Sequence, residues 1–522
     1  MSINPGQRRS AQIKTGQARE VRMQTKDDTP TRRAGDDPLT GPTTHFINGQ
    51  WLEKVSTFPD RNPFTGEVVA EVAAGGRAEA DQAVTAAAAA FPKWATMPPG
   101  QRQALFLRAA EIIERRLPET VRLLALETGS SATFASFQVQ WSAALMRQAA
   151  NWGYRPVGDV LRSDTPDRFA MAIRKPLGVV AGFTPWNGAF NLAWRTFALP
   201  MAFGNTVVVK PSEEAPISAG LIQAEILEEA GFPAGTVNVV THAPGGARAV
   251  ADVFFERQEV RCINFTGSDR TGRMLAERAG RSLKRIVLEL GGYNPMIILG
   301  DADIDNAVNA AIFGAFIHQG QVCMCTRKVY VDRAAHDDFV EKLAAKTRTL
   351  KAGDPVDPTV IIGPLINEGA LEHVESAVHD AVHRGARVIT GGSRDGSIYP
   401  PTILADVADD SFVTSGCDEV FGPVVVVEPF DDVEEALAKA QATPYGLSAS
   451  IMTGNQQRGL AMAQRFDAGI VHVNGATMAG EPALPNGGVK DSGWGRSGYY
   501  SIEDFTEVQL TTVTSGPGRY PF

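Results

Sequence analysis

From residue 176 onward, short β-branched runs alternate with helical stretches, and this alternation constrains the fold more than any other feature of the sequence. Short apolar strands separated by helices are typical of βαβ units, which build a parallel sheet covered by helices on both faces. A second alternating series runs from Val287 through a strand at 424–427 to the segment 468–474. The sequence therefore predicts an α/β protein with two doubly wound sheets, of which the first is expected to bind a nucleotide. The first series consists of Val179-Val180, 207–209, 217–230, 237–240 and 263–265.

Length, charge and cysteine content limit the classes of protein that remain. A chain of 522 residues is too long for one hydrophobic core, so several lobes are expected. Its 50 basic and 59 acidic residues leave a formal net charge of −9, which offers nucleic acid no attractive surface. We find no apolar run long enough for a membrane helix. Only four cysteines indicate a reducing compartment, so we expect a soluble, cytoplasmic protein without nucleic-acid or membrane partners.

Residues 1–42 are polar, show no hydrophobic period and are predicted to form a disordered or arm-like tail. The basic residues near its start would also fit a mitochondrial transit peptide, but Pro5 and Gly6 fit it poorly, and no apolar signal region is present. Order is predicted to begin at 46–51, where Asn-Gly between apolar residues indicates a hairpin. Apolar residues at helical spacing predict helices at 78–94 and 101–116.

A loop rich in glycine and glutamine carries two cysteines. It spans 318–326 and follows an alanine-rich helical stretch, 307–316. A cysteine is most often a small buried hydrophobic residue, but in this turn backbone amides are expected to lower the pKa of Cys323 and to donate to an oxyanion. The Cys323-x-Cys325 spacing also raises the question of a metal. With His318 alone beside it and no second cysteine pair, no metal site is predicted.

Two further polar residues lie close to apolar segments. Glu289 stands between two leucines and before two glycines, where burial is expected to raise its pKa toward that of a general base. Asn187 follows the 179–184 strand, and an asparagine at a strand end is more often a turn former than a catalytic donor. Asn187 becomes a candidate catalytic residue only when it is considered together with the other motifs of the chain.

Three segments bear on nucleotide binding. The strand 207–209 delivers Lys210 and Glu213 to its carboxyl end, where open α/β sheets bind ligands. The segment 265–268 opens a predicted helix whose free amides suit phosphate. The segment 493–498 matches the dinucleotide fingerprint GxGxxG literally, but it follows no predicted strand and is rejected as the cofactor loop.

These segments, with two more near the C-terminus, follow one another in an order that resembles the aldehyde dehydrogenase superfamily. The resemblance covers residues 45–513, and a chance coincidence of seven ordered motifs is negligible. The motifs are Pro185-Trp186-Asn187, Lys210-Pro211-Ser212-Glu213, Phe265-Thr266-Gly267-Ser268, Leu288-Glu289-Leu290-Gly291-Gly292, Gly320-Gln321-Val322-Cys323, Glu419-Val420-Phe421-Gly422-Pro423 and Gly487-Gly488-Val489-Lys490-Asp491-Ser492-Gly493.

The resemblance implies a role for each motif. Cys323 would be the nucleophile and Glu289 the general base, while the Asn187 side-chain amide and the Cys323 backbone amide would stabilise the oxyanion. Lys210 and Glu213 would hold the adenosine ribose, where Glu213 would repel a 2′-phosphate, so NAD is expected as the cofactor rather than NADP. The complete dinucleotide set implied is Trp186, Lys210, Ser212, Glu213, Thr266, Gly267, Ser268, Glu419 and Phe421.

The family's fold implies an aldehyde dehydrogenase-like architecture with an NAD-binding lobe, a catalytic lobe and a β oligomerisation arm. The NAD-binding domain would comprise 43–153 and 177–288, the catalytic domain 289–490, and the arm 154–176 with 491–522. The arm would pair subunits, so a homodimer or homotetramer is expected.

The implied reaction is NAD-dependent oxidation of an aldehyde to its acid through a Cys323 thioester that Glu289-activated water hydrolyses. The 318–324 loop, Arg195 and the 495–498 stretch resemble bacterial benzaldehyde, vanillin and salicylaldehyde dehydrogenases, so an aromatic aldehyde is expected. Several residues depart from that pattern, and they leave the substrate list open. These are Gly188-Ala189-Phe190, Tyr293-Asn294, Asn486 and Tyr499. A CoA-acylating aldehyde dehydrogenase and a non-catalytic binding protein that kept the fold remain as alternatives.

Overall fold

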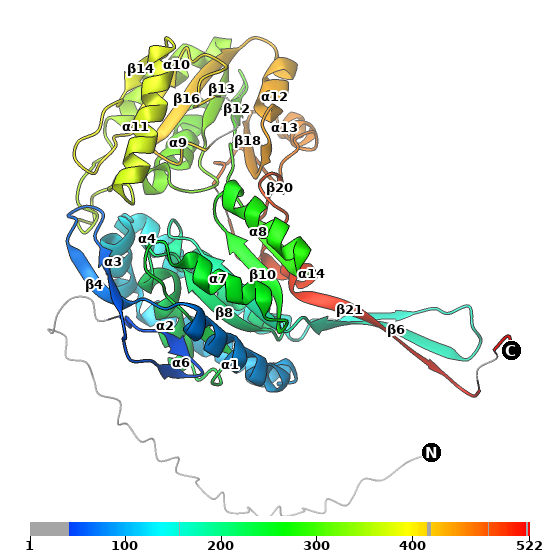
Figure 1. Ribbon diagram of the computed structural model, residues 1–522. Coiled ribbons are helices and arrows are strands. Elements are labelled where there is room, and N and C mark those ends of the chain that lie inside the picture. The colour runs from blue at the N-terminus through cyan, green and yellow to red at the C-terminus, as the bar shows by residue number, and fades with distance from the viewer. Residues whose placement is uncertain (1–40, 156, 415–418, 479, 518–519) are drawn as a thin grey trace, which may run out of the picture. The chain divides into compact units, whose positions relative to one another are not determined.

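The protein is described by a computed structural model that covers residues 41–155, 157–414, 419–478, 480–517 and 520–522 (Figure 1). These residues contain two seven-stranded sheets, one three-stranded sheet and two sheets of two strands. The predicted tail, 1–42, lies outside the described residues except for its last two positions.

The first seven-stranded sheet has the order β11-β10-β7-β8-β9-β1-β2, in which β7 to β11 are parallel. The antiparallel pair β1 and β2 forms one edge, where Asn48 and Gly49 adopt the positive φ angles, 55° and 74°, of an Asn-Gly hairpin turn. The predicted hairpin and parallel sheet are both confirmed. The strands are β1 (Phe46–Ile47), β2 (Gln50–Trp51), β7 (Val179–Thr184), β8 (Thr206–Pro211), β9 (Val237–Val239), β10 (Val260–Thr266) and β11 (Arg285–Glu289).

Helices cover both faces of this sheet. Helices α1, α7 and α8 pack on one face, where Val84, Phe254 and Leu275 join Phe183 and Ile263 of the strands in one buried cluster. Helices α5 and α6 pack against β7, β8 and β9, with α2, α3 and α4 next to them. The bounds are α1 (Arg77–Ala95), α2 (Pro99–Arg115), α3 (Leu117–Thr128), α4 (Ala132–Trp152), α5 (Ala189–Ala202), α6 (Ile222–Glu229), α7 (Ala247–Glu256) and α8 (Asp269–Arg281).

The second seven-stranded sheet has the order β14-β15-β16-β13-β12-β18-β19, parallel except for the edge strand β14. Helices α9 and α10 cover one face of this sheet. Helices α11, α12 and α13 cover the other face, where they bury the alternate side chains of the same strands. The elements are β12 (Met296–Ile298), α9 (Ile304–Phe316), β13 (Lys328–Asp332), α10 (Arg333–Thr347), α11 (Glu368–His383), β14 (Arg387–Thr390), β15 (Thr402–Ala405), β16 (Val424–Phe430), α12 (Val433–Gln441), β18 (Ser448–Met452), α13 (Gln456–Ala463) and β19 (Ile470–Val473). The fold class, two doubly wound sheets, is as expected.

The second alternating series does not begin at Val287, as the sequence suggested. Strand β11 is the edge of the first sheet and pairs in parallel with β10, so that Val287 lies opposite Asn264 and Glu289 opposite Thr266. Only a short loop separates β11 from β12, and the apolar pattern runs through it without a helical interruption. Glu289 is therefore the last residue of a strand in the first sheet.

A three-stranded antiparallel sheet joins β21, β6 and β5, and Figure 1 shows β21 and β6 side by side as a long ribbon. Its strands, β5 (Gly158–Leu161), β6 (Arg168–Pro176) and β21 (Thr506–Thr514), lie within the segments expected for the arm. The smaller pairs are β3 (Thr57–Arg61) with β4 (Val68–Ala73) and β17 (Tyr445–Gly446) with β20 (Val489–Lys490); a short helix, α14 (Ile502–Phe505), precedes β21. In the part of the chain that the structure describes, no helix combines the length and apolar character needed to cross a bilayer.

Candidate active site

Most residues singled out from the sequence lie at the carboxyl ends of the first sheet's strands. Trp186 and Asn187 follow β7, Lys210 to Glu213 extend from β8, and Glu289 ends β11. Ser268 caps α8 directly after β10, because its Oγ accepts the Thr271 amide at 3.4 Å. The parallel arrangement thus brings together side chains that lie far apart in the sequence.

Cys323 follows a strained turn after α9. His318 and Gln319 adopt left-handed backbone angles, with φ of 48° and 54°, and Gly320 follows at 71°. Such angles disfavour residues other than glycine by about 1 kcal/mol or more each, so neighbouring groups must hold the turn. Gln319 Nε2 donates to the carbonyls of Gly129 and Pro364 at 2.8 and 2.9 Å. A Cβ on Gly320 would lie 2.1 Å from the Gly422 carbonyl oxygen, so the close packing of the turn requires glycine there.

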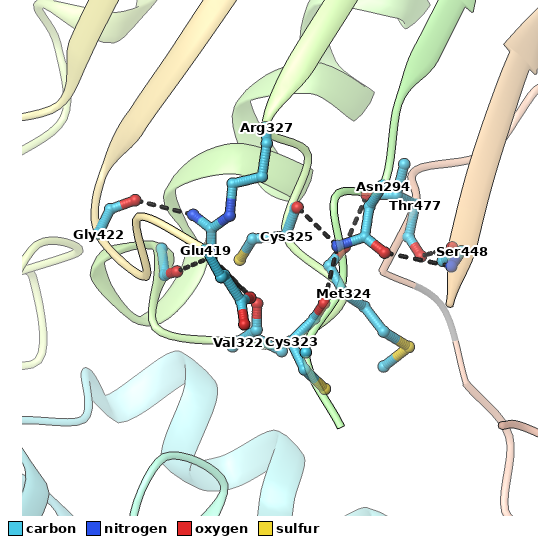
Figure 2. Close-up of polar contacts among 12 residues, drawn as sticks. Asn294, Val322, Cys323, Met324, Cys325, Arg327, Glu419, Gly422, Ser448 and Thr477 are labelled. Carbon is cyan, nitrogen blue, oxygen red and sulfur yellow. Dashed lines mark hydrogen bonds and ion pairs between the residues drawn. The ribbon is translucent and has the colours of Figure 1, made fainter. Parts of the chain in front are cut away.

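Two side chains hold the backbone of this loop, and Figure 2 shows them on either side of it. Asn294 Nδ2 donates to the carbonyls of Cys323 and Cys325 at 2.7 and 3.0 Å. Arg327 donates to the carbonyls of Gly320 and Gly422 at 2.7 and 2.9 Å, and its guanidinium lies 3.4 Å from Glu419. These contacts fix the loop's carbonyls and leave the Cys323 side chain at the edge of two cavities.

The expected lowering of the Cys323 pKa is wrong. Burial raises the pKa of this thiol to about 12, and the nearby carboxylates of Glu419 and Glu289 add to the shift. Desolvation and two negative neighbours outweigh any stabilisation from backbone amides, so the thiol holds its proton in this state. Cys325 is fully buried and burial also raises its pKa, to about 11. Cys262 is likewise buried with a raised pKa, and Cys417 lies outside the described residues.

The expected rise in the Glu289 pKa is confirmed. Burial raises it to about 7, although the positive charges of Arg195 and Arg496 oppose the shift. Arg195 Nη2 lies 3.4 Å from Glu289 Oε1, and that oxygen has no hydrogen-bond partner among the described residues. A carboxyl with a pKa near 7 is suited to accept and release protons at neutral pH.

Three adjoining cavities surround these groups. The first, about 300 Å³ in volume, is walled mainly by apolar side chains, and the second and third have volumes of about 500 and 900 Å³. Cys323, Glu289 and Asn187 border both the first and the second cavity and therefore lie at their junction. The apolar wall of the first cavity includes Phe134, Phe137, Trp141, Leu192, Phe313 and Met478.

The second and third cavities contain every residue that was expected to hold a dinucleotide. Trp186, Thr266 and Gly267 border both, so the two cavities are continuous. The second is also bordered by Ser268, Glu419 and Phe421, and the third by Lys210, Ser212 and Glu213.

His242, which no sequence motif identified, lies beside Lys210. Lys210 Nζ donates to His242 Nε2 at 2.6 Å, while His242 Nδ1 donates to the Ala243 carbonyl at 2.9 Å. Burial lowers the Lys210 pKa to about 8, and burial with the Lys210 charge lowers the His242 pKa to about 4. A neutral His242 thus orients the ammonium at the edge of the third cavity. The one signal in the sequence was a histidine three residues after the end of β9, on the side of the sheet where open α/β folds bind ligands.

No group of three or more His, Cys, Asp or Glu side chains is placed to hold a metal ion within the described ranges.

Comparison with known proteins adds independent evidence. The model of the aldehyde dehydrogenase family matches residues 51–511. A vanillin dehydrogenase from Pseudomonas sp. (strain HR199 / DSM 7063) is 46% identical over 89% of this chain and 96% of its own length. A benzaldehyde dehydrogenase [NAD(+)] from Pseudomonas putida is 37% identical over 88% of this chain and 94% of its own.

A crystal structure of a salicylaldehyde dehydrogenase from Pseudomonas putida G7, complexed with salicylaldehyde, superposes with a TM-score of 0.89 at 37% identity, covering 92% of this chain and 99% of that one. The resemblance noted from the motifs is confirmed. The chain belongs to the aldehyde dehydrogenase family.

Proposed function

We propose that the protein oxidises an aromatic aldehyde to its carboxylic acid with NAD, using Cys323 as nucleophile and Glu289 as general base. The observation that carries this proposal is the position of Cys323, Glu289 and Asn187 at the junction of an apolar cavity and a larger, more polar channel. An aldehyde in the first cavity and a dinucleotide in the channel would meet at the Cys323 side chain.

The aromatic class is supported by the walls of the first cavity. Aromatic side chains such as Phe134, Phe137 and Trp141 suit a planar ring, which packs well against other rings in stacked or edge-on geometry. Similar proteins named vanillin, benzaldehyde and salicylaldehyde dehydrogenases point to the same class. Asn486 and Arg195 supply polar groups for a ring substituent.

The second and third cavities suit a dinucleotide by their shape and donors. The Gly245 backbone borders the third cavity, and a Cβ added there would meet no atom within 4 Å, so a ligand can approach it closely. Lys210 and Glu213 supply a donor and an acceptor for ribose hydroxyls, while the N-terminus of α8 supplies amides for a pyrophosphate. When bound, NAD accepts the hydride that leaves the aldehyde carbon. The Glu213 carboxylate would repel a 2′-phosphate and favours NAD over NADP.

The chemistry requires a base near Cys323, since the thiol pKa is about 12. Glu289, whose pKa is about 7, borders the same two cavities and accepts that proton. The thiolate then forms a bond to the aldehyde carbon, and the Asn187 amide with the Cys323 N–H stabilises the resulting oxyanion. After the hydride has left, a thioester remains on Cys323.

Hydrolysis of that thioester needs Glu289 again, after its carboxyl has released the thiol proton to solvent. Its carboxylate takes a proton from water while the water oxygen bonds to the acyl carbon. The C–S bond then breaks, and Cys323 leaves as the thiolate while the acid departs. Burial of Glu289 keeps its pKa in the range where it can serve both proton transfers at neutral pH.

We propose that the three-stranded sheet pairs with a second copy of the chain, giving a homodimer or homotetramer. Strand β21 is an edge strand whose outer backbone groups are free of any partner strand in the described sheet. Exposed apolar side chains lie along this sheet, among them Val160, Phe169, Val508, Leu510 and Val513. A partner subunit would cover both the free backbone edge of β21 and these exposed apolar side chains.

The test is NADH formation with benzaldehydes, phenylacetaldehydes and aliphatic aldehydes, for the natural chain, Cys323→Ala and the neighbouring control Cys325→Ala. We expect Cys323→Ala to abolish NADH formation and Cys325→Ala to retain most of it, with benzaldehydes giving the highest kcat/KM. Turnover by Cys323→Ala would overturn the assignment. An acyl-CoA product on addition of CoA would favour the CoA-acylating alternative, against which the buried Glu289 argues.

A further inference from the structure

The segment 493–498, which matches the dinucleotide fingerprint but was rejected as the cofactor loop, lies beside Glu289. The amides of Trp494 and Gly495 both donate to the Leu288 carbonyl, at 3.1 and 3.2 Å. Gly493 pairs with Glu289 in an antiparallel bridge. The segment therefore extends the edge of the first sheet at the strand that carries the proposed general base.

Two glycines near this edge make room for the Glu289 carboxylate. A Cβ on Gly495 would lie 2.9 Å from Glu289 Oε1 and 2.7 Å from Val287 Cγ1. A Cβ on Gly487 would lie 2.9 Å from the same Oε1 and only 2.0 Å from the Gly495 carbonyl oxygen. Neither glycine has a positive φ, in contrast to Gly493 at 93°. The backbone angles at Gly487 and Gly495 would thus be suitable for any residue type. Glycine is required at both positions because a side chain has no space there.

The backbone at Gly487 and the backbone at Gly495 form the two walls of a narrow slot around the Glu289 carboxylate. Arg496 connects these two walls. Its Nη1 donates to the carbonyls of Gly488 and Gly495, at 2.7 and 2.8 Å, and its amide donates to Asp504 Oδ2 at 3.0 Å. The slot therefore has two backbone walls joined by one guanidinium, and Arg195 approaches the carboxylate at 3.4 Å.

We propose that Gly487 and Gly495 are positioning residues for Glu289: they form a slot without side chains that holds its carboxylate in place for proton transfer, and Arg496 keeps the slot's two walls together. This inference rests on the proposed role of Glu289 as general base. The slot acts through Glu289 alone, so its disturbance should have no effect once that base is absent.

Gly495→Ala is the most direct perturbation, because the atoms its Cβ would meet belong to side chains, Val287 and Glu289, which can shift. At Gly487 the closest atom belongs to the backbone. A displacement of the base by a fraction of an ångström to about 1 Å can lower a rate by up to about 100-fold, so we expect kcat of Gly495→Ala to fall by about ten-fold or more. NAD affinity, measured by calorimetry, should stay within about two-fold, because Gly495 borders neither the second nor the third cavity.

The decisive measurement is a double-mutant cycle with Glu289→Gln, which keeps the side chain's size but removes the base. We expect Gly495→Ala to lower kcat strongly in the natural chain and by less than about two-fold in the Glu289→Gln background. Gly280→Ala serves as a matched control, since a Cβ there meets nothing within 4 Å, and it should behave as the natural chain.

The proposal would be overturned if the fold-loss of kcat in the double variant equalled the product of the two single-variant losses. An unchanged kcat in folded Gly495→Ala would also overturn it. If Gly495→Ala does not fold, the same cycle with Arg496→Met, which disconnects the two walls, decides in the same way. Failure of the underlying function would look different: the natural chain would form no NADH from aldehydes, or Glu289→Gln would keep full kcat.

Discussion

Arg195 should set the pH at which the proposed base works. Its guanidinium lies 3.4 Å from Glu289 Oε1, and both side chains are largely buried, at 17% and 11% exposure. The positive charge lowers the Glu289 pKa, which burial raises, and the balance is about 7. Replacement of Arg195 by methionine removes the charge and keeps an unbranched side chain of similar reach, so the pKa of Glu289 should rise.

The size of the rise follows from the distance. Two unit charges 3.4 Å apart interact by about 1.2 kcal/mol at a dielectric constant of about 80 and by about 5 kcal/mol at about 20. At about 1.36 kcal/mol per pKa unit, these limits correspond to a rise of about 1 to 3.5 units. At pH 7 the ionised fraction of Glu289 would fall from about one half to about one tenth or less, so kcat should fall at least about four-fold.

The assay is the pH dependence of kcat at saturating aldehyde, together with the burst of NADH in the first turnover. We expect the ascending limb of the profile to move to higher pH in Arg195→Met, with activity recovering above pH of about 8 to 10. Arg115→Met is the matched control, because Arg115 pairs with Glu229 at the exposed surface and should leave the profile unchanged. A profile for Arg195→Met that coincides with that of the natural chain would refute the reasoning, and so would a loss of kcat that no pH restores.

Two further predictions concern the cofactor and stability. Glu213→Gln removes a negative charge from the third cavity and should raise kcat/KM for NADP relative to NAD; a ratio equal to that of the natural chain would contradict the proposed ribose contact. Asp60 and Glu127 form a buried pair in which burial and mutual repulsion raise the pKa of Asp60 well above its usual value. A raised pKa in the folded state gives stability that is complete below the unfolded pKa and is lost as the pH rises from the unfolded to the folded pKa. Asp60→Asn should therefore flatten the fall of the unfolding temperature between these two pKa values, and an unaltered slope in that pH range would count against the pair.

Most of the fold could be predicted because its signals are local. The β-branched runs at β7 and β8 and the Asn48-Gly49 turn each specify a nearby backbone state, and the parallel order follows from the strand and helix alternation. The boundary between the sheets was misplaced, since the loop after Glu289 is short and its flanking strands are equally apolar. No local pattern distinguishes the edge of one sheet from the start of the next.

The site was predicted less completely, because several of its properties depend on distant groups. The raised Cys323 pKa reflects burial and the carboxylates of Glu289 and Glu419, which lie far from it in the sequence. His242 belongs to no recognised motif, and it acts through its contact to Lys210. Arg496 lies in the rejected 493–498 fingerprint, and its contacts to the Gly488 and Gly495 carbonyls could not be predicted from that pattern. Burial and long-range charge are properties of the assembled fold. A sequence pattern can therefore identify the reacting residues, but it does not predict their protonation states.

The literal fingerprint at 493–498 shows why a pattern can be present without its usual ligand. In a dinucleotide loop, missing Cβ atoms let the backbone approach a pyrophosphate closely. Here the missing Cβ atoms of Gly495 and Gly487 let two backbone segments approach the Glu289 carboxylate, with Oε1 only 2.9 Å from the position each Cβ would take. The same physical requirement, close approach of an anion to a bare backbone, favours glycine in both settings. The glycines therefore indicate a close approach to the backbone, and only the fold determines that the group beside it is a carboxyl of the protein itself.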